Sequence, residues 1–371
     1  MSDLEKPVLQ PTQHRGLALQ QGLLLLLSIA LLLTLALLLL PSAWLPEEVQ
    51  RLRATEATEA ADTSLRLVDQ SLVLTVGADG DYLSLNAALG VASGMRHRFT
   101  GTDAGIEIRI LPGTVLNEQV HLYSMDLSHI RLSGPEPVTV DISGFEHADD
   151  DRDSVPFINA QRGSRTPLID VLFEQAPVPA SEDTAANEHG AVGLLLNRGS
   201  SAVITPNGGF TGYRDGATVY NGSTLSARFG TLQGTRWGLH ARHMSDANLR
   251  SATITGGEIG VWARRASRID VRAANLSGTG GVGILADNVS LVEAHGAQLH
   301  SRDVAAHAFR GGQINLLEAD LEGSVLGAQV SDGGFIFAHQ LSKLEGVETL
   351  FSVMPNAFSR DGVIFSDVDQ D

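Results

Sequence analysis

A repeat of 22 to 23 residues between Gly193 and Phe337 most constrains how this chain can fold. A near-constant period of this length predicts a solenoid, in which each unit buries its apolar face only against its neighbours. Each repeat starts at a small residue that precedes an apolar one. These starts are Gly193, Gly216, Gly238, Gly260, Gly283, Ala305 and Gly327.

Three short segments recur within each repeat, and each has alternating small or aliphatic positions. One repeat shows all three, at residues 260–263 (GVWA), 269–271 (IDV) and 274–276 (ANL). Alternation with period 2 is typical of a strand with one inward face. Three strands in a coil of 22 residues predict a parallel β-helix, and the sequence lacks the patterns of leucine-rich and ankyrin repeats.

The composition supports one long domain and removes several classes of function. A β-helix grows along one axis, so we expect the β-structure of this 371-residue chain to form a single domain. The net charge of −17 argues against a nucleic-acid partner, whose binding proteins carry a basic surface. The sequence has no cysteine, which excludes disulfides, thiol catalysis and zinc–thiolate sites. We identify no cofactor and no metal site from the sequence.

An uncharged run from Gly22 to Leu40 is long enough to cross a bilayer as a helix. We predict a polar tail over residues 1–16 and a transmembrane helix over 17–45, with Trp44 at the membrane interface. A cleaved signal peptide is the alternative, although residues 41–43 (PSA) fit a cleavage site poorly.

The charges that flank this run do not decide its orientation, since Lys6 and Arg15 precede it and Arg51 and Arg53 follow it. The bulk of the protein follows the anchor, and β-helices usually work outside the cytoplasm. We therefore expect a single-pass protein of the inner, cytoplasmic membrane whose β-helix lies in the periplasm or outside the cell.

Residues 46–71 are rich in Glu, Ala, Arg and Leu and predict a helical stalk. The stalk is either a solvated juxtamembrane helix or an oligomerising one, so a homotrimer stays open.

The β-helix is predicted over residues 72–346, with a short capping helix near 84–94 whose N-cap is Ser84. Residues 162–190 predict a loop inserted before the regular repeat. A C-terminal cap and tail are expected over 347–371.

The entry to the β-region resembles a known group of proteins. The segments that carry the resemblance are residues 75–82 (TVGADGDY), 84–89 (SLNAAL), 108–113 (IRILPG), 118–120 (EQV) and 126–130 (DLSHI). Together they resemble the opening of pectin-lyase-like β-helix proteins and, more narrowly, modules of phage tail fibres and tailspikes. The resemblance covers about residues 72–340. It implies a single-stranded right-handed parallel β-helix, while the membrane anchor departs from a virion tail protein.

The repeat also predicts which side chains share an outer face. In the first strand of each coil the residues one and three positions after the start point inward, and those two and four positions after it point outward. Stacked coils lie about 4.8 Å apart, so outward residues of successive coils form columns. The aromatic and charged members of this predicted face are Tyr220, His240, Arg242, Trp262, Arg264, His307 and Phe309.

Aromatic and arginine side chains on a flat sheet suit stacking on sugar rings and hydrogen bonding to acidic groups. We therefore interpret these seven residues as a candidate site for a polysaccharide or another partner. The alternatives are that they are ordinary exposed residues, or that another subunit or a loop covers them.

The calcium-loop motif and the polysaccharide-lyase motif are both incomplete in this sequence. Residues 149–153 (DDDRD) have the spacing of the first ligands of a calcium loop, but Ser154 replaces the required glycine and Ala160 the final glutamate. Residues 165–170 (RTPLID) approach the Arg-x-Pro-x-x-Arg segment of β-helical polysaccharide lyases, but end in Asp170.

Glycosidases of this fold need carboxylates on one face. The outward carboxylates Asp270 and Asp320 are expected on different strands, and Asp287 has no acidic neighbour in the adjacent coils. A pair formed between a loop and the helix stays open.

The sequence thus favours a non-catalytic, membrane-anchored β-helix that binds a polysaccharide or protein partner. A pectin-lyase-like enzyme that degrades or modifies a polysaccharide is the first alternative. A phage-derived structural fibre component is the second.

Overall fold

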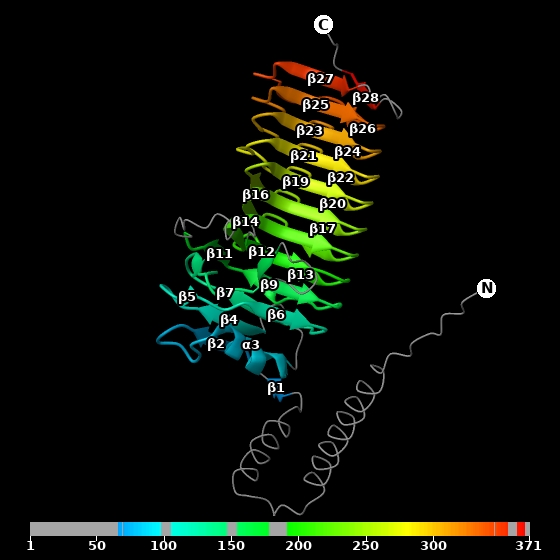
Figure 1. Cartoon of the computed structure of the whole chain (residues 1–371). Coiled ribbons are helices and arrows are strands. Elements are labelled where there is room, and N and C mark those ends of the chain that lie inside the picture. Colours follow the sequence, from blue (N-terminus) through cyan, green and yellow to red (C-terminus); the bar gives the residue numbers. More distant parts are fainter. Residues whose placement is uncertain are drawn as a thin grey trace, which may run out of the picture. The chain divides into compact units, whose positions relative to one another are not determined.

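The computed structural model describes residues 66–68, 70–97, 105–146, 154–177, 191–344, 346–354 and 362–367. They belong to one compact unit, residues 66–371. Its strands pair in parallel and stack in chain order (Figure 1). The repeated parallel strands form an all-β solenoid and fit a parallel β-helix, which confirms the architecture predicted from the period.

The N-terminal end of the stack holds the capping helix. This end contains β1 (Arg66–Val68), β3 (Met95–His97) and α3 (Leu85–Ser93). Ser84 is the N-cap of α3, as predicted, and its side chain accepts a hydrogen bond from the Ala87 N–H. The Glu118 carboxylate also accepts the N–H groups of Leu85 and Asn86, at the positive end of the helix dipole. The apolar face of α3 packs onto the first coils and covers the open end of the core.

Three sheets make up the solenoid. The four-stranded sheet contains β2 (Leu72–Val76), β4 (Ile106–Ile110), β7 (Ile130–Ser133) and β10 (Leu168–Asp170). The eight-stranded sheet contains β13 (Ser201–Val203), β15 (Thr224–Ser226), β17 (Asp246–Asn248), β20 (Arg268–Asp270), β22 (Leu291–Glu293), β24 (Gln313–Asn315), β26 (Phe335–Ala338) and β28 (Val363–Ser366).

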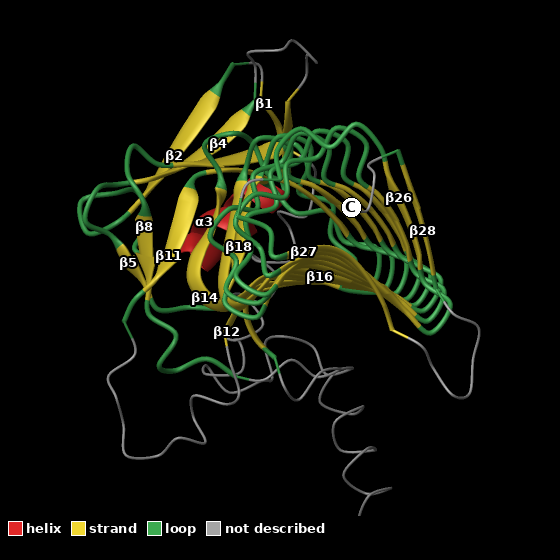
Figure 2. Ribbon diagram, turned by 90° about the horizontal axis from the view of Figure 1, so that it is seen from above, coloured by secondary structure: helices red, strands yellow, loops and turns green. Residues whose placement is uncertain are grey.

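The third and largest sheet carries the first strand of every regular coil. Its members are β5 (Val115–Leu116), β6 (Val120–Tyr123), β8 (Val138–Val140), β9 (Val155–Gln161), β11 (Leu172–Gln175), β12 (Ala191–Leu196), β14 (Gly209–Tyr220), β16 (Thr231–Arg242), β18 (Thr253–Gly256), β19 (Ile259–Arg264), β21 (Val282–Asp287), β23 (Val304–Phe309), β25 (Leu326–Ser331) and β27 (Thr349–Met354). Seen along the stack, β16 and β27 lie over one another on one side and β26 and β28 on another (Figure 2).

The inward columns confirm the predicted register. Leu239 pairs with Val261 and Val261 with Ile284, and all three side chains are buried. Every coil from β12 onward repeats this step of 22 or 23 residues. The steps from β6 to β9 and from β9 to β12 are longer, since Val120 pairs with Ile158 and Ile158 with Leu194. The core of the entry coils contains an aromatic column in which Phe173 lies 4.9 Å from Phe157 and 5.7 Å from Phe210 between ring centroids.

A buried serine column follows the first strands. Ser200, Ser223, Ser245, Ser267 and Ser290 are each at most 1% exposed. The Ser267 hydroxyl donates to the Arg264 carbonyl at 2.9 Å and accepts the Ser245 N–H at 3.3 Å. These bonds satisfy polar groups that would otherwise be costly to bury, and so they stabilise the turn.

Three predicted boundaries are wrong in part. β1 lies inside the stalk predicted over 46–71, because pairing with β3 overrides local helix propensity. β10 and β11 lie inside the loop predicted over 162–190. β27 and β28 continue both sheets beyond residue 346, where Leu350 replaces the small residue that marks the earlier coils.

The predicted membrane segment and most of the predicted stalk lie outside the residues that the structure describes. No helix in the described part of the chain is long and apolar enough to span a membrane. The transmembrane helix predicted over 17–45 lies outside the described residues, as do the aspartates of residues 149–153 and most of the stalk.

Candidate functional site

The seven predicted face residues lie in two neighbouring outward columns of the largest sheet. His240 pairs with Trp262, which pairs with Leu285, which in turn pairs with His307. The second column runs through Tyr220, Arg242, Arg264, Asp287 and Phe309. The register therefore brings the predicted residues together as expected, with Leu285 and Asp287 between the two groups.

Trp237 joins the first group, and sequence reasoning missed it. Its ring centroid lies 4.5 Å from that of His240 and 5.1 Å from that of Trp262, both edge to face. His240 and Trp262 stack at 4.5 Å with an interplanar angle of 16°. We call Tyr220, Trp237, His240, Arg242, Trp262 and Arg264 the aromatic–arginine face.

Trp237 was missed because strict alternation places it on the inner side with Leu239. A Cβ on Gly238 would lie 2.6 Å from Ile254 Cγ2 in the core, so positions 238 and 239 both face inward. The alternation breaks at this glycine, and Trp237 turns outward. The glycine that starts this repeat, Gly238, was the available signal in the sequence.

Arginine side chains accompany each aromatic ring of this face. The guanidinium carbon of Arg242 lies 3.7 Å from the Tyr220 ring centroid, and that of Arg236 lies 3.8 Å from the Trp237 ring. Arg264 lies 5.1 Å from the Trp262 ring and pairs with Asp287 at 3.3 Å. A chain with a net charge of −17 thus gathers three guanidinium groups at one place, where cation–π contacts hold them.

The side chains of this face are more buried than outward residues on a flat, exposed sheet would be. Tyr220 is 5% exposed, Trp237 8% and His240 2%, whereas Arg242, Trp262 and Arg264 are half-buried. Burial, together with the charges of Arg242 and Arg264, lowers the pKa of His240 well below its usual value, so the imidazole is neutral at pH 7.

Buried polar atoms of this face that have no hydrogen-bond partner within the described ranges include the indole Nε1 of Trp262 and the Nε2 of His240. Buried polar groups are usually satisfied, so unpaired atoms beside an open surface indicate where a ligand could bond. Trp262 as a whole is half-buried, and its indole N–H can donate to a hydroxyl or carboxylate oxygen.

The other two predicted face residues form a separate, smaller group. His307 and Phe309 lie 6.0 Å apart between ring centroids, and the His307 Nε2 is 2.9 Å from the Ser331 hydroxyl. Arg310 lies 4.4 Å from the Phe309 ring. Burial lowers the pKa of His307. These two residues repeat the aromatic–arginine pairing two coils away without a tryptophan.

Asp170, which ends the lyase-like segment, and Asp270, one of the outward carboxylates, are held by hydrogen-bond donors. Asp170 accepts hydrogen bonds from Arg131, Thr205 and Asn207. Asp270 pairs with Arg250 and Arg272. Such neutralised carboxylates suit a structural role, because every lone pair is already directed at a donor.

Asp320 has a different setting, in a group of side chains that was not predicted from the sequence. The ligand atoms of His300, Asp320 and Glu322 all lie within 4.8 Å of one another. We call these three residues the acidic corner. His300 and Glu322 stand one period apart, and this spacing is the signal that could have found them.

No known protein-family model matches this chain, and no curated protein shows significant similarity to it.

Proposed function

We propose that this chain is a membrane-anchored, non-catalytic, right-handed β-helix that binds an acidic polysaccharide outside the cytoplasm. The carrying observation is the contiguous group of Trp237, His240 and Trp262 flanked by three arginines. A protein partner is the alternative occupant of the same face.

The chemistry of the face fits a sugar that carries carboxylates. Indole rings offer apolar faces to the C–H groups of a sugar ring. Guanidinium groups bind carboxylates through two parallel hydrogen bonds, whereas neutral sugars do not need them. The Trp262 N–H, unpaired among the described residues, supplies a further donor. We infer that uronic-acid polysaccharides fit better than neutral ones.

The proposal also includes a location, with the chain anchored in a membrane and the β-helix outside the cytoplasm. The uncharged run over residues 22–40 supports a membrane helix over 17–45, followed by a stalk that holds the β-helix away from the bilayer. The periplasm or the cell exterior is where a protein meets acidic polysaccharides in bulk.

The test is a glycan array probed with the full chain in detergent micelles, with uronic-acid and neutral polysaccharides side by side. The double variant Arg242→Gln/Arg264→Gln should lose at least about tenfold in affinity, because charge-assisted hydrogen bonds contribute about 1.5–3 kcal/mol each. Arg268→Gln, an exposed change on β20 in the eight-stranded sheet, is the matched control and should bind normally.

Full retention by the double variant, or binding to no polysaccharide, would remove the proposal. The same array is read for cleavage products, since shortened chains would favour the enzyme alternative.

A further inference from the structure

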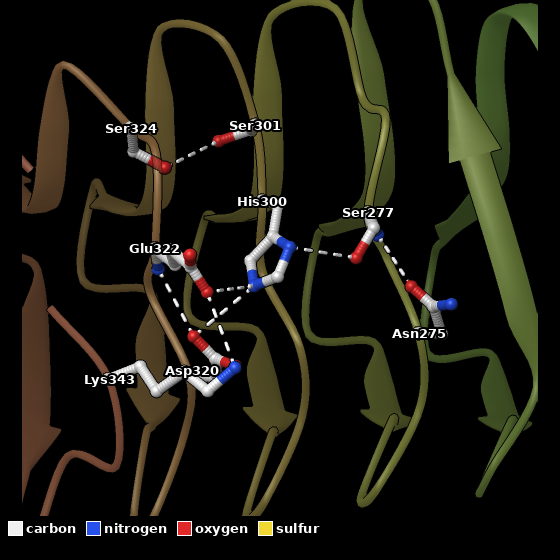
Figure 3. Close-up of polar contacts among 8 residues, drawn as sticks. All are labelled: Asn275, Ser277, His300, Ser301, Asp320, Glu322, Ser324 and Lys343. Carbon is white, nitrogen blue, oxygen red and sulfur yellow. Dashed lines mark hydrogen bonds and ion pairs between the residues drawn. The ribbon is translucent and has the colours of Figure 1, made fainter. Parts of the chain in front are cut away.

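The acidic corner lies at the third segment of two successive coils (Figure 3). Gln298 and Asp320 form a parallel bridge, and the Leu299 N–H donates to the Asp320 carbonyl at 2.7 Å. This pairing carries His300 alongside Asp320 and Glu322. The backbone of the solenoid therefore sets the spacing of all three side chains.

The ring of His300 is oriented toward the two carboxylates. The Ser277 hydroxyl lies 3.1 Å from Nδ1 and holds one side of the ring. The other nitrogen, Nε2, lies 3.2 Å from Asp320 Oδ1 and 3.9 Å from Glu322 Oε2. This nitrogen is buried, yet no hydrogen bond of good geometry reaches it within the described part of the chain. A histidine held at Nδ1 with its Nε2 directed at carboxylates has the arrangement of a metal ligand with its outer partner.

The two carboxylates lie close together and share one cation, the Lys343 ammonium. Asp320 is 6% exposed, and its Oδ1 accepts the Glu322 N–H at 3.2 Å. The Lys343 ammonium lies 3.4 Å from Glu322 Oε2 and 3.7 Å from Asp320 Oδ2. Its hydrogen bond to Glu322 raises the pKa of Lys343. The lysine side chain is 61% exposed, so it can swing into water when another cation arrives.

We propose that His300, Asp320 and Glu322 bind one divalent transition-metal ion of the Zn²⁺ type, and that Lys343 leaves when the metal enters. One imidazole nitrogen and two carboxylate oxygens suit Zn²⁺, whereas Ca²⁺ and Mg²⁺ prefer oxygen alone. Tetrahedral bonds of about 2.1 Å need ligand atoms roughly 3.4 Å apart, so small rotations of the half-exposed Glu322 close the site. Three protein ligands leave a fourth position for water or a ligand oxygen.

Substitutions at Lys343 and at the proposed ligands should change Zn²⁺ affinity in opposite directions. Lys343→Met removes the competing charge and should tighten Zn²⁺ binding. His300→Ala and Glu322→Gln each remove a ligand and should weaken it by at least about tenfold, since even outer partners of metal ligands contribute 10- to 100-fold. Ser277→Ala releases the ring and should weaken binding by about tenfold.

The experiment is a titration of the full chain, freed of metal with a chelator, with ZnCl₂ followed by calorimetry and by competition with a chromophoric chelator. The matched control is His295→Ala. His295 pairs with Glu318 at 2.9 Å in the same two coils, but among the described residues no third ligand joins that pair.

The expected result is one equivalent of Zn²⁺ that depends on His300 and not on His295. Circular dichroism of each variant confirms folding, and the half-exposed position of Glu322 makes that variant a second route if His300→Ala misfolds. The proposal is overturned by the absence of stoichiometric Zn²⁺ binding, by unchanged binding in folded His300→Ala or Glu322→Gln, or by loss of binding in His295→Ala. Binding of Ca²⁺ in preference to Zn²⁺ would overturn it as well.

Discussion

The aromatic–arginine face and the acidic corner lie on different coils of one solenoid and are built in opposite ways. His240 is 2% exposed and lies among rings and guanidinium groups, whereas the His300 side chain is 31% exposed and faces two carboxylates. The difference follows from the neighbours in each column. Trp237 and Trp262 fill the space over His240, while the small Ser277 side chain contacts His300 and the flexible Lys343 contacts its two carboxylate neighbours. The outward columns of a solenoid can be either buried and aromatic or partly exposed and charged, because its stability depends on the inward columns.

The largest expected difference between the two regions is in stability. Trp237→Ala should lower the free energy of unfolding by about 3–5 kcal/mol, because it removes a buried ring and leaves a cavity between His240 and Trp262. His300→Ala should cost less than about 1 kcal/mol, since the side chain is partly exposed. Urea unfolding followed by circular dichroism measures both. Equal losses would show that the two regions do not differ as the packing indicates.

A smaller effect concerns the ion pair at the edge of the aromatic–arginine face. Asp287 is 4% exposed at its side chain and relies on Arg264, so Arg264→Gln should cost about 1–3 kcal/mol at pH 7. Burial raises the pKa of Asp287. A raised pKa makes the charged form costly as the pH rises through it, so the loss should shrink toward pH 4. The added change Asp287→Asn should restore stability at pH 7, and failure of that rescue would contradict the assignment.

The smallest expected effect is a pH dependence of the free energy of unfolding, caused by His240 of the aromatic–arginine face. The unfolded chain protonates His240 near pH 6.5, whereas the folded chain resists because the folded pKa is lowered. The stability contributed by neutral His240 is complete above pH 6.5 and is lost as the pH falls below it, with a slope of about 1.4 kcal/mol per pH unit.

His240→Gln should reduce that slope between pH 6.5 and 5 in chemical denaturation experiments. His129, His243 and His307 also have lowered pKa values and account for the slope that remains. An unchanged slope in His240→Gln would mean that the imidazole is solvated.

Much of the scaffold was predictable because its signals are local. Alternation within each strand and the constant period already specify that Leu239, Val261 and Ile284 stack inside, and the structure places them there. The capping helix with Ser84 was predictable for the same reason. The pairing of β1 with β3 was not, because its partner lies beyond a helix in the sequence.

The period, the inward columns and the two outward columns follow from the residue pattern alone, since they need only the number of residues per coil and the alternation of a strand. The burial of individual outward side chains, the turn of Trp237 at Gly238 and the contact of His300 with Asp320 and Glu322 arise only in the folded coils. Those outcomes depend on side-chain volumes and charges in successive coils, and no pattern within a single coil contains them.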